Sequence, residues 1–156
     1  MKKVIGYVST KDLGTLKEQD IKNLDVINIA FGLIERHRVV WDSCGNEEYL
    51  PKIREINPDI KIVLSVGGWG ADGFSQAART EEGRALFAVS AVSLVETYGL
   101  DGIDIDWEYP GTSLAGIGSH VNDKENYTLL LKALRESLNH MEGEKSLSVA
   151  VGGDVY

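Results

Sequence analysis

Five short apolar stretches alternate with helical patterns along this chain, and the alternation limits the folds that the chain can adopt. The stretches are rich in Val, Ile and Leu and cover residues 3–8, 26–33, 61–66, 102–107 and 147–151. Apolar strands of this kind are typical of parallel sheets that are covered on both faces. The order of strands and helices therefore predicts an α/β fold built from βαβ units.

The segments between the strands predict four helices, at residues 16–24, 47–56, 80–98 and 124–141. Pro58 ends the second helix and Gly99 the third, because proline disfavours a helical residue before it and glycine readily takes the turn that closes a helix. Asp123 is placed to cap the fourth helix. Residues 38–41 predict a small β excursion, and the Gly- and Ser-containing residues 110–122 predict a long loop.

Two architectures fit these elements: a doubly wound open sheet and part of a (β/α)8 TIM barrel. A complete barrel typically needs about 250 residues, whereas this chain has 156. No linker-like composition divides residues 1–156, which therefore predict a single domain. If the fold is a barrel, the chain supplies about five of its eight strands and the barrel is incomplete.

The charge and hydropathy of the chain argue against nucleic acid and against a membrane as partners. A formal net charge of -8 repels nucleic-acid phosphates, so nucleic acid is not an expected partner. No run of about 18 apolar residues is present, so no membrane span is expected. The first residues also lack the apolar core of a signal peptide. Localisation stays open, and removal of a signal peptide would be consistent with an extracellular location.

Residues 101–110 read DGIDIDWEYP and place acids at alternating positions of an apolar strand. Since successive side chains of a strand face opposite sides, Asp104, Asp106 and Glu108 share one face, each about 7 Å from the next. The apolar residues between them share the opposite face and are expected to pack under helices. A barrel interior suits the acidic face, and Glu108 then lies at the C-terminal mouth, where active sites of this fold are built.

Carboxylates this close together cannot all ionise at low cost. At least one pKa is expected to rise, and a proton to be shared along the row, which makes Glu108 a candidate general acid near neutral pH. Two other interpretations remain: the acids lie on a solvated edge strand, or they hold a hard cation. The cation is disfavoured because acids along one strand diverge and no histidine lies nearby in the sequence, so no metal ligand is assigned.

The same residues carry a resemblance to a known family. The sequence from Asp101 through Gly102 to Glu108 matches the DGxDxDxE signature of glycoside hydrolase family 18, the chitinase family. The SxGG motif of that family is matched upstream by Ser65, Gly67 and Gly68. Residues 5–7, 27–31 and 147–151 resemble the first, second and fifth strands of the family's barrel. The resemblance covers the whole chain in order and implies the barrel architecture.

This resemblance implies a substrate-assisted glycosidase that needs no cofactor. Glu108 would protonate the glycosidic oxygen, while the 2-acetamido oxygen of the sugar attacks its own anomeric carbon. Asp106 would accept a hydrogen bond from the acetamido N–H, and Asp104 would share a proton with Asp106. Asp101 and Gly102 are expected to be structural, at the strand start. The implied substrate is chitin or an oligosaccharide that contains N-acetylglucosamine.

Aromatic residues beside the acids are expected to contact the sugar. Tyr7 and Phe31 would line the site from the first two strands, or else belong to the barrel core. Trp69 would stack on a sugar face, or else pack within its loop, and Tyr109 directly follows the acid. The glycines of the SxGG motif would let the floor of the site pack closely.

The family pattern continues beyond the strands found here. A strand-six tyrosine and a strand-eight tryptophan of the family have no counterpart, which indicates the N-terminal portion of a longer catalytic barrel. The edge strands near residues 3–8 and 147–151 would then be exposed, which predicts a homodimer or larger homo-oligomer, through edge pairing or through closure of two half-barrels. With the later strands missing, the alternatives to a working hydrolase are a sugar-binding protein without turnover and an inert folding fragment.

Overall fold

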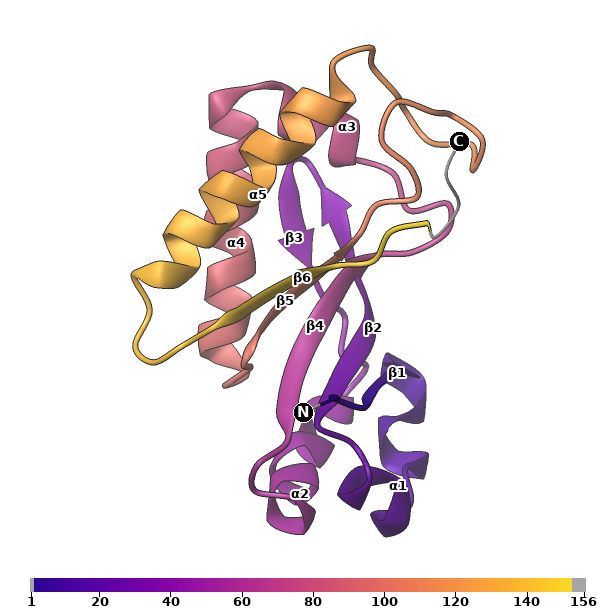
Figure 1. Cartoon of the computed structure of the whole chain (residues 1–156), viewed down its shortest axis with the longest axis vertical. Coiled ribbons are helices and arrows are strands. Elements are labelled where there is room, and N and C mark those ends of the chain that lie inside the picture. Colours follow the sequence, from indigo (N-terminus) through magenta and orange to yellow (C-terminus); the bar gives the residue numbers. More distant parts are fainter. Residues whose placement is uncertain (1, 153–156) are drawn as a thin grey trace.

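A computed structural model of the chain, which describes residues 2–152, contains one six-stranded sheet in the order β1-β2-β4-β5-β6, with β3 paired to β2 (Figure 1). The strands are β1 (Ile5–Ser9), β2 (Val26–Glu35), β3 (Arg38–Val40), β4 (Lys61–Gly67), β5 (Gly102–Asp106) and β6 (Ser146–Val149). All neighbours along the main path are parallel, which confirms the predicted βαβ units. The predicted β excursion is an antiparallel hairpin, for which β2 extends to Glu35.

The helices are α1 (Glu18–Lys22), α2 (Tyr49–Ile56), α3 (Phe74–Arg79), α4 (Glu81–Thr97) and α5 (Asp123–Asn139), with 3-10 turns at Thr10–Thr15 and Asn46–Glu48. The sequence did not predict α3 or the first 3-10 turn. Thr80 separates α3 from α4, because its hydroxyl accepts a hydrogen bond from the Gly83 amide and starts the second helix. Asp123 was wrongly predicted as a helix cap: it is the first residue of α5, and its side chain turns inward.

The core lies between the outer face of the sheet and the helices. Figure 1 shows α4 and α5 side by side along this face, and α3 packs against both. Ile103, Ile105 and Trp107 are buried there, as the strand alternation predicted. Trp107 stacks on Phe74 of α3 with ring centroids 5.2 Å apart. Each fully buried side chain of this size stabilises the fold by roughly 1.5–3 kcal/mol, so the non-acidic side of β5 anchors the strand.

The opposite face of the sheet is concave. Tyr7 of β1 donates a hydrogen bond of 2.8 Å to Asp104 of β5, although β2 and β4 lie between these strands in the sheet. A phenol can bridge that separation only if the sheet curls, as it does in a barrel wall. The curvature therefore gathers side chains from β1, β4, β5 and β6 on one inner surface. Within residues 2–152, no helix is long and apolar enough to cross a membrane.

Candidate active site

Asp104 is the centre of the concave surface. Its side chain is buried, and it accepts hydrogen bonds from three hydroxyls: Tyr7 and Ser65 at 2.8 Å on Oδ2, and Ser148 at 2.6 Å on Oδ1. These donors come from β1, β4 and β6, so one carboxylate ties together strands on both sides of β5. Burial, followed by the hydrogen bond to Asp104, raises the pKa of Tyr7 to about 12, which keeps the phenol a donor at neutral pH.

Asp106 lies two residues further along β5, on the same face, and shares a hydrogen bond with Glu108. Burial raises the pKa of Asp106 to about 6, and the neighbouring charges of Glu108 and Asp104 add to the rise. The expectation of a crowded acidic row with a raised pKa is therefore met at Asp106. Asp104 adds to this rise in pKa through its charge, and its own side chain accepts the hydroxyls of Tyr7, Ser65 and Ser148.

The raised pKa of Asp106 predicts a pH dependence of stability. A folded-state pKa of about 6, above the ordinary 3.8, means that the folded protein prefers the protonated acid, so stability falls as pH rises from about 4 to about 6. Asp106→Asn has no charge to bury. We expect its free energy of unfolding, relative to the parent, to increase between pH 4 and pH 7 in urea titrations. A difference that stays constant over this range would contradict the assigned environment.

The SxGG motif places β4 against the backbone of Asp106. The Gly68 amide donates a 2.9 Å hydrogen bond to the Asp106 carbonyl oxygen. A Cβ on Gly67 would lie 2.1 Å from that same oxygen, and one on Gly68 would lie 2.8 Å from the Phe31 ring. Both glycines also have positive φ angles. Ser65, buried beside them, donates to Asp104. Together these residues form the floor next to the acids.

A comparison of two glycines tests this close packing. Gly67→Ala is expected to lower the free energy of unfolding by about 2–4 kcal/mol, because it adds a steric clash to an unfavourable backbone angle. Gly70→Ala is the matched control: Gly70 has a φ of +82°, but a Cβ there would meet its nearest atom only at 3.7 Å. Its cost should be about 1–2 kcal/mol, from the backbone angle alone. Equal losses in urea unfolding would contradict the proposed contact.

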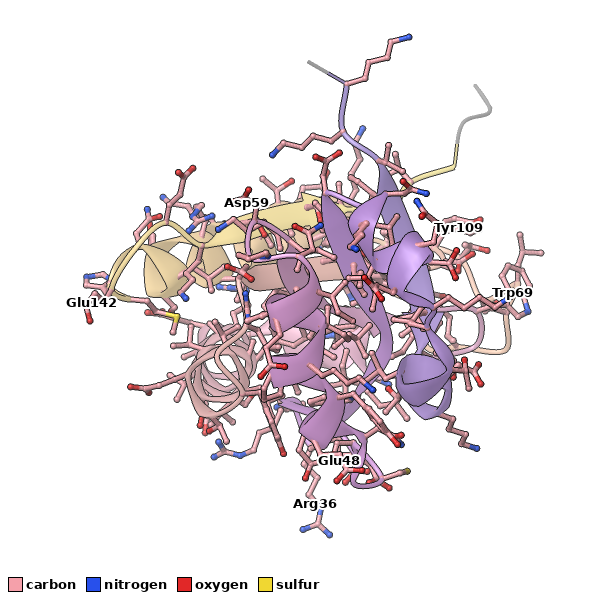
Figure 2. The ribbon with its side chains drawn as sticks, turned by 90° about the horizontal axis from the view of Figure 1, so that it is seen from below. Arg36, Glu48, Asp59, Trp69, Tyr109 and Glu142 are labelled. Atoms are coloured by element: carbon pink, nitrogen blue, oxygen red, sulfur yellow. The ribbon has the colours of Figure 1, made fainter. Side chains whose placement is uncertain are left out.

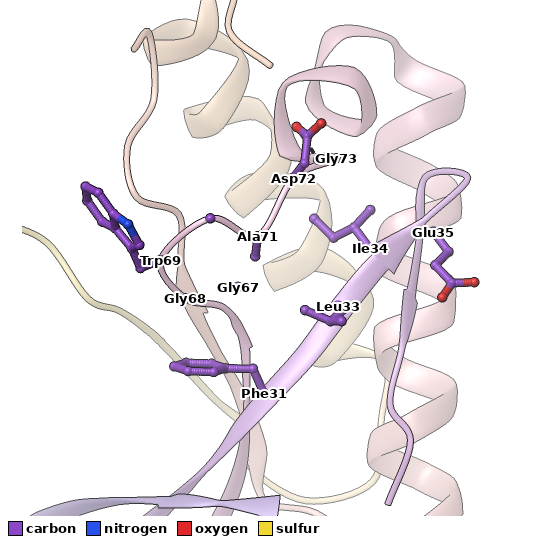
Figure 3. Close-up of a pocket in the computed structure, with 11 residues that line it drawn as sticks. Phe31, Leu33, Ile34, Glu35, Gly67, Gly68, Trp69, Ala71, Asp72 and Gly73 are labelled. Carbon is purple, nitrogen blue, oxygen red and sulfur yellow. Dashed lines mark hydrogen bonds between the residues drawn. The ribbon is translucent and has the colours of Figure 1, made fainter. Parts of the chain in front are cut away.

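Aromatic side chains surround this floor. Phe31 lines two neighbouring cavities, one of about 560 Å³ that reaches Trp69 and one of about 510 Å³ that includes Tyr7 and Asp106. Figure 3 shows Phe31 and Trp69 on either side of Gly68, and Figure 2 shows Trp69 and Tyr109 at the margin of the molecule. The rings of Trp69 and Tyr109 meet edge to face, 6.3 Å apart. Trp69 is 65% exposed, so it offers a free ring face of the kind that stacks on sugars.

Asp101 and Gly102 lie at the other end of β5, away from the acids. Burial opposes ionisation of the Asp101 carboxylate, but hydrogen bonds from the Ile62 amide and Arg54, each at 2.9 Å, and from Lys61 at 3.3 Å hold its pKa below the ordinary value. A Cβ on Gly102 would lie 2.2 Å from the Ser146 carbonyl oxygen, so only glycine lets β6 pair there. Both residues shape the strand start rather than the acidic row.

Ser148 also belongs to the site, although the sequence did not predict it. Its register partner on β5 is Asp104, but this pairing becomes visible only when β6 is placed beside β5.

Within residues 2–152, no group of three or more His, Cys, Asp or Glu side chains is arranged to hold a metal ion. The concave face combines neighbouring carboxylates with exposed aromatic rings.

Known proteins are similar to this chain in sequence. The sequence model of the family described as Glycosyl hydrolases family 18 matches residues 3–155. Chitinase A1 of Niallia circulans is 42% identical over 120 residues, which cover 72% of this chain and 17% of that protein. Chitotriosidase-1 of Mus musculus is 35% identical over 113 residues, which cover 69% of this chain and 24% of that protein.

Solved structures match along nearly the whole chain. A glycoside hydrolase family 18 N-acetylglucosaminidase from Paenibacillus barengoltzii has a TM-score of 0.93 and 45% identity, over 98% of this chain and 47% of that one. The chitinase domain of the spore coat protein CotE from Clostridium difficile has a TM-score of 0.87 and 38% identity, over 99% of this chain and 43% of that one. This chain thus spans less than half of each of these structures, and the curled sheet corresponds to part of their fold.

Proposed function

The chain belongs to glycosyl hydrolases family 18, and from this membership we propose that it hydrolyses β-1,4 bonds between N-acetylglucosamine units, with Glu108 as the general acid. The observation that carries the proposal is the pair formed by Asp106 and Glu108 on the concave face, in which burial and the neighbouring carboxylates raise the pKa of Asp106 to about 6. Asp106 can therefore hold a proton up to about pH 6 beside Glu108.

In the proposed reaction, the protonated Glu108 donates its proton to the glycosidic oxygen as the bond from that oxygen to the anomeric carbon breaks. The carbonyl oxygen of the sugar's own 2-acetamido group forms a bond to the anomeric carbon, and Asp106 accepts a hydrogen bond from the acetamido N–H. A water molecule then attacks the anomeric carbon, gives its proton to Glu108 and restores the acetamido group. Two inversions at one carbon leave its configuration retained.

The other residues of the concave face support this chemistry. Asp104, with three hydroxyl donors, supplies a fixed negative charge behind Asp106 and adds to the rise in its pKa. Tyr7 and Phe31 line the cavity beside Asp106, and we assign them to the walls of the sugar site. Trp69 and Tyr109 form the aromatic rim and are assigned to sugar stacking. Asp101, Gly102 and the SxGG residues are assigned structural roles.

The similar proteins support a substrate that contains N-acetylglucosamine. These proteins are chitinases and an N-acetylglucosaminidase. We propose chitin or chito-oligosaccharides as the substrate. We further propose that residues 1–156 form the N-terminal part of a family 18 catalytic domain, since the Paenibacillus enzyme extends well beyond the aligned part.

The exposed edges of the sheet predict the oligomeric state of the chain. β1 and β6 lie at the two ends of the strand order, with Ile5 and Val149 exposed. Unpaired edges of this kind recruit other strands, so a polypeptide of these 156 residues is expected to form a homo-oligomer. Light scattering coupled to size exclusion should report at least twice the chain mass. Ile5→Lys should shift the distribution toward monomer, and a strictly monomeric parent at high concentration would contradict the prediction.

Two fluorogenic substrates test the proposed function. A 4-methylumbelliferyl chitobioside carries the 2-acetamido group, whereas the corresponding cellobioside has a hydroxyl in its place. The proposal predicts release of the fluorophore from the chitobioside and none from the cellobioside, because only the first substrate supplies its own nucleophile. Equal turnover of both would contradict substrate assistance. Turnover of neither, with chitotriose still bound in a calorimetric titration, would favour the sugar-binding alternative.

A further inference from the structure

The segment after Glu108 is a loop whose two ends are joined by a single carboxylate. Asp123 is fully buried at the start of α5. Its Oδ2 accepts the backbone N–H groups of His120 at 2.7 Å and Gly111 at 3.3 Å. Its Oδ1 accepts the Ser75 hydroxyl of α3 at 2.8 Å. A surface loop whose ends are held close in this way is an Ω-loop, and Asp123 forms its neck.

A second contact attaches the same loop to the glycine-rich segment after β4. The Asp72 carboxylate accepts the Gly118 amide at 2.9 Å. Ile117 of the loop is buried in the hydrophobic core, and a Cβ on Gly70 would lie 3.7 Å from the Ala115 carbonyl oxygen. The loop is therefore held both at its neck and along its side, next to the segment that carries Trp69.

The neck of the loop lies close to Glu108 in the sequence. Only Tyr109 and Pro110 separate Glu108 from Gly111, whose amide Asp123 holds. A misplacement of about 1 Å in a reacting group can cost about 100-fold in rate. We propose that Asp123 is a positioning residue, which closes the loop from Gly111 to His120 and thereby fixes Glu108 and Tyr109 against the sugar site. The inference rests on the proposed function for its catalytic consequence.

An uncharged asparagine could make the same contacts as Asp123. All three donors are uncharged groups, and no ion pair within residues 2–152 includes this carboxylate. An asparagine can place its oxygen where Oδ2 accepts both amides, and its NH₂ group can donate to the Ser75 hydroxyl, which then accepts. Asp123→Asn can therefore keep the hydrogen bonds that hold the two ends of the loop, whereas Asp123→Ala removes them. This pair of variants separates the geometry of the residue from its charge.

The hydrogen-exchange rates of the Gly111 and His120 amides test, without any substrate, whether Asp123 holds the two ends of the loop together. In the parent chain, the Gly111 and His120 amides should exchange as slowly as amides of β5. In Asp123→Ala they should exchange at least about tenfold faster, while β5 stays protected; Asp123→Asn should remain within about twofold of the parent. Val121→Ala, a change at an exposed residue of the same segment, is the control and should alter neither amide. Fast exchange of both amides in the parent chain would overturn the proposal even if Asp123→Ala fails to fold.

Kinetics on the chitobioside then test the catalytic consequence. Asp123→Ala should lower kcat by about 10- to 100-fold with a smaller change in KM, and Asp123→Asn should restore most of the rate. Loss of the neck with unchanged kcat would overturn the positioning role while leaving the proposed function intact. If the parent chain shows no turnover, the proposed function fails, and the exchange data still decide whether Asp123 holds the loop.

Discussion

Replacing Glu108 with glutamine is expected to lower the hydrolysis rate of a fluorogenic chitobioside by about 10²- to 10⁴-fold. Glutamine keeps the size and polarity of the side chain, but it has no proton to give to the glycosidic oxygen, and a positioned general acid contributes this range of rate. The affinity for chitotriose should change little, because the variant leaves Trp69, Phe31 and the SxGG floor in place. Initial rates and calorimetric titration measure the two quantities separately.

The control for this variant is Glu125→Gln, which removes an exposed acid from the first turn of α5. It changes the net charge by the same amount but leaves the concave face untouched, so both rate and affinity should match the parent. A Glu108→Gln variant that retains more than about a tenth of the parent rate would show that another group supplies the proton. The assignment of Glu108 would then be wrong, although family membership would be unaffected.

Replacing Asp104 with alanine is expected to lower the free energy of unfolding by about 3 kcal/mol and to abolish turnover. The variant removes the common acceptor of the Tyr7, Ser65 and Ser148 hydroxyls, and hydrogen bonds to a charged group are each worth about 1.5–3 kcal/mol before the cost of burying the charge is subtracted. Because these donors come from three strands, the curl of the sheet should also loosen. Urea unfolding monitored by tryptophan fluorescence measures the loss.

Ser148→Ala is the graded control, since it removes one of the three donors and leaves Asp104 in place. Its expected cost is about 1 kcal/mol. The two variants should therefore differ by about 2 kcal/mol. If Asp104→Ala is no less stable than Ser148→Ala, the carboxylate does not hold the strands together, and the concave surface must owe its shape to the packing of the opposite face.

The alternation of residues 102–107 predicted both faces of β5 correctly. Trp107 and the two isoleucines pack under the helices, while Asp104 and Asp106 lie on the concave side. This succeeded because a strand has a fixed two-residue period, so that local sequence alone decides which side chains share a face. The resemblance of residues 101–108 and of the SxGG motif to family 18 likewise depended only on local spacing, and the family match confirms it.

Features that depend on contacts between distant residues escaped prediction. Tyr7 bonds to Asp104 across 97 positions of the chain and Ser75 to Asp123 across 48, and no local pattern marks either pair. An aspartate before a helix usually caps it, so Asp123 was assigned that role until the fold showed its side chain directed inward. Helix α3 was missed for a related reason: its six residues follow a glycine-rich loop, and its buried face packs on α4, α5 and Trp107, which local sequence does not place beside it.

The most direct test of the central claim is the anomeric form of the first product. Proton NMR recorded during hydrolysis of chitotetraose can distinguish the two anomers before they interconvert. Substrate assistance on the concave face, with Glu108 acting first as acid and then as base, predicts that the β anomer accumulates first. Initial accumulation of the α anomer would mean that water attacks directly with inversion, and it would contradict the roles assigned to Asp106 and Glu108.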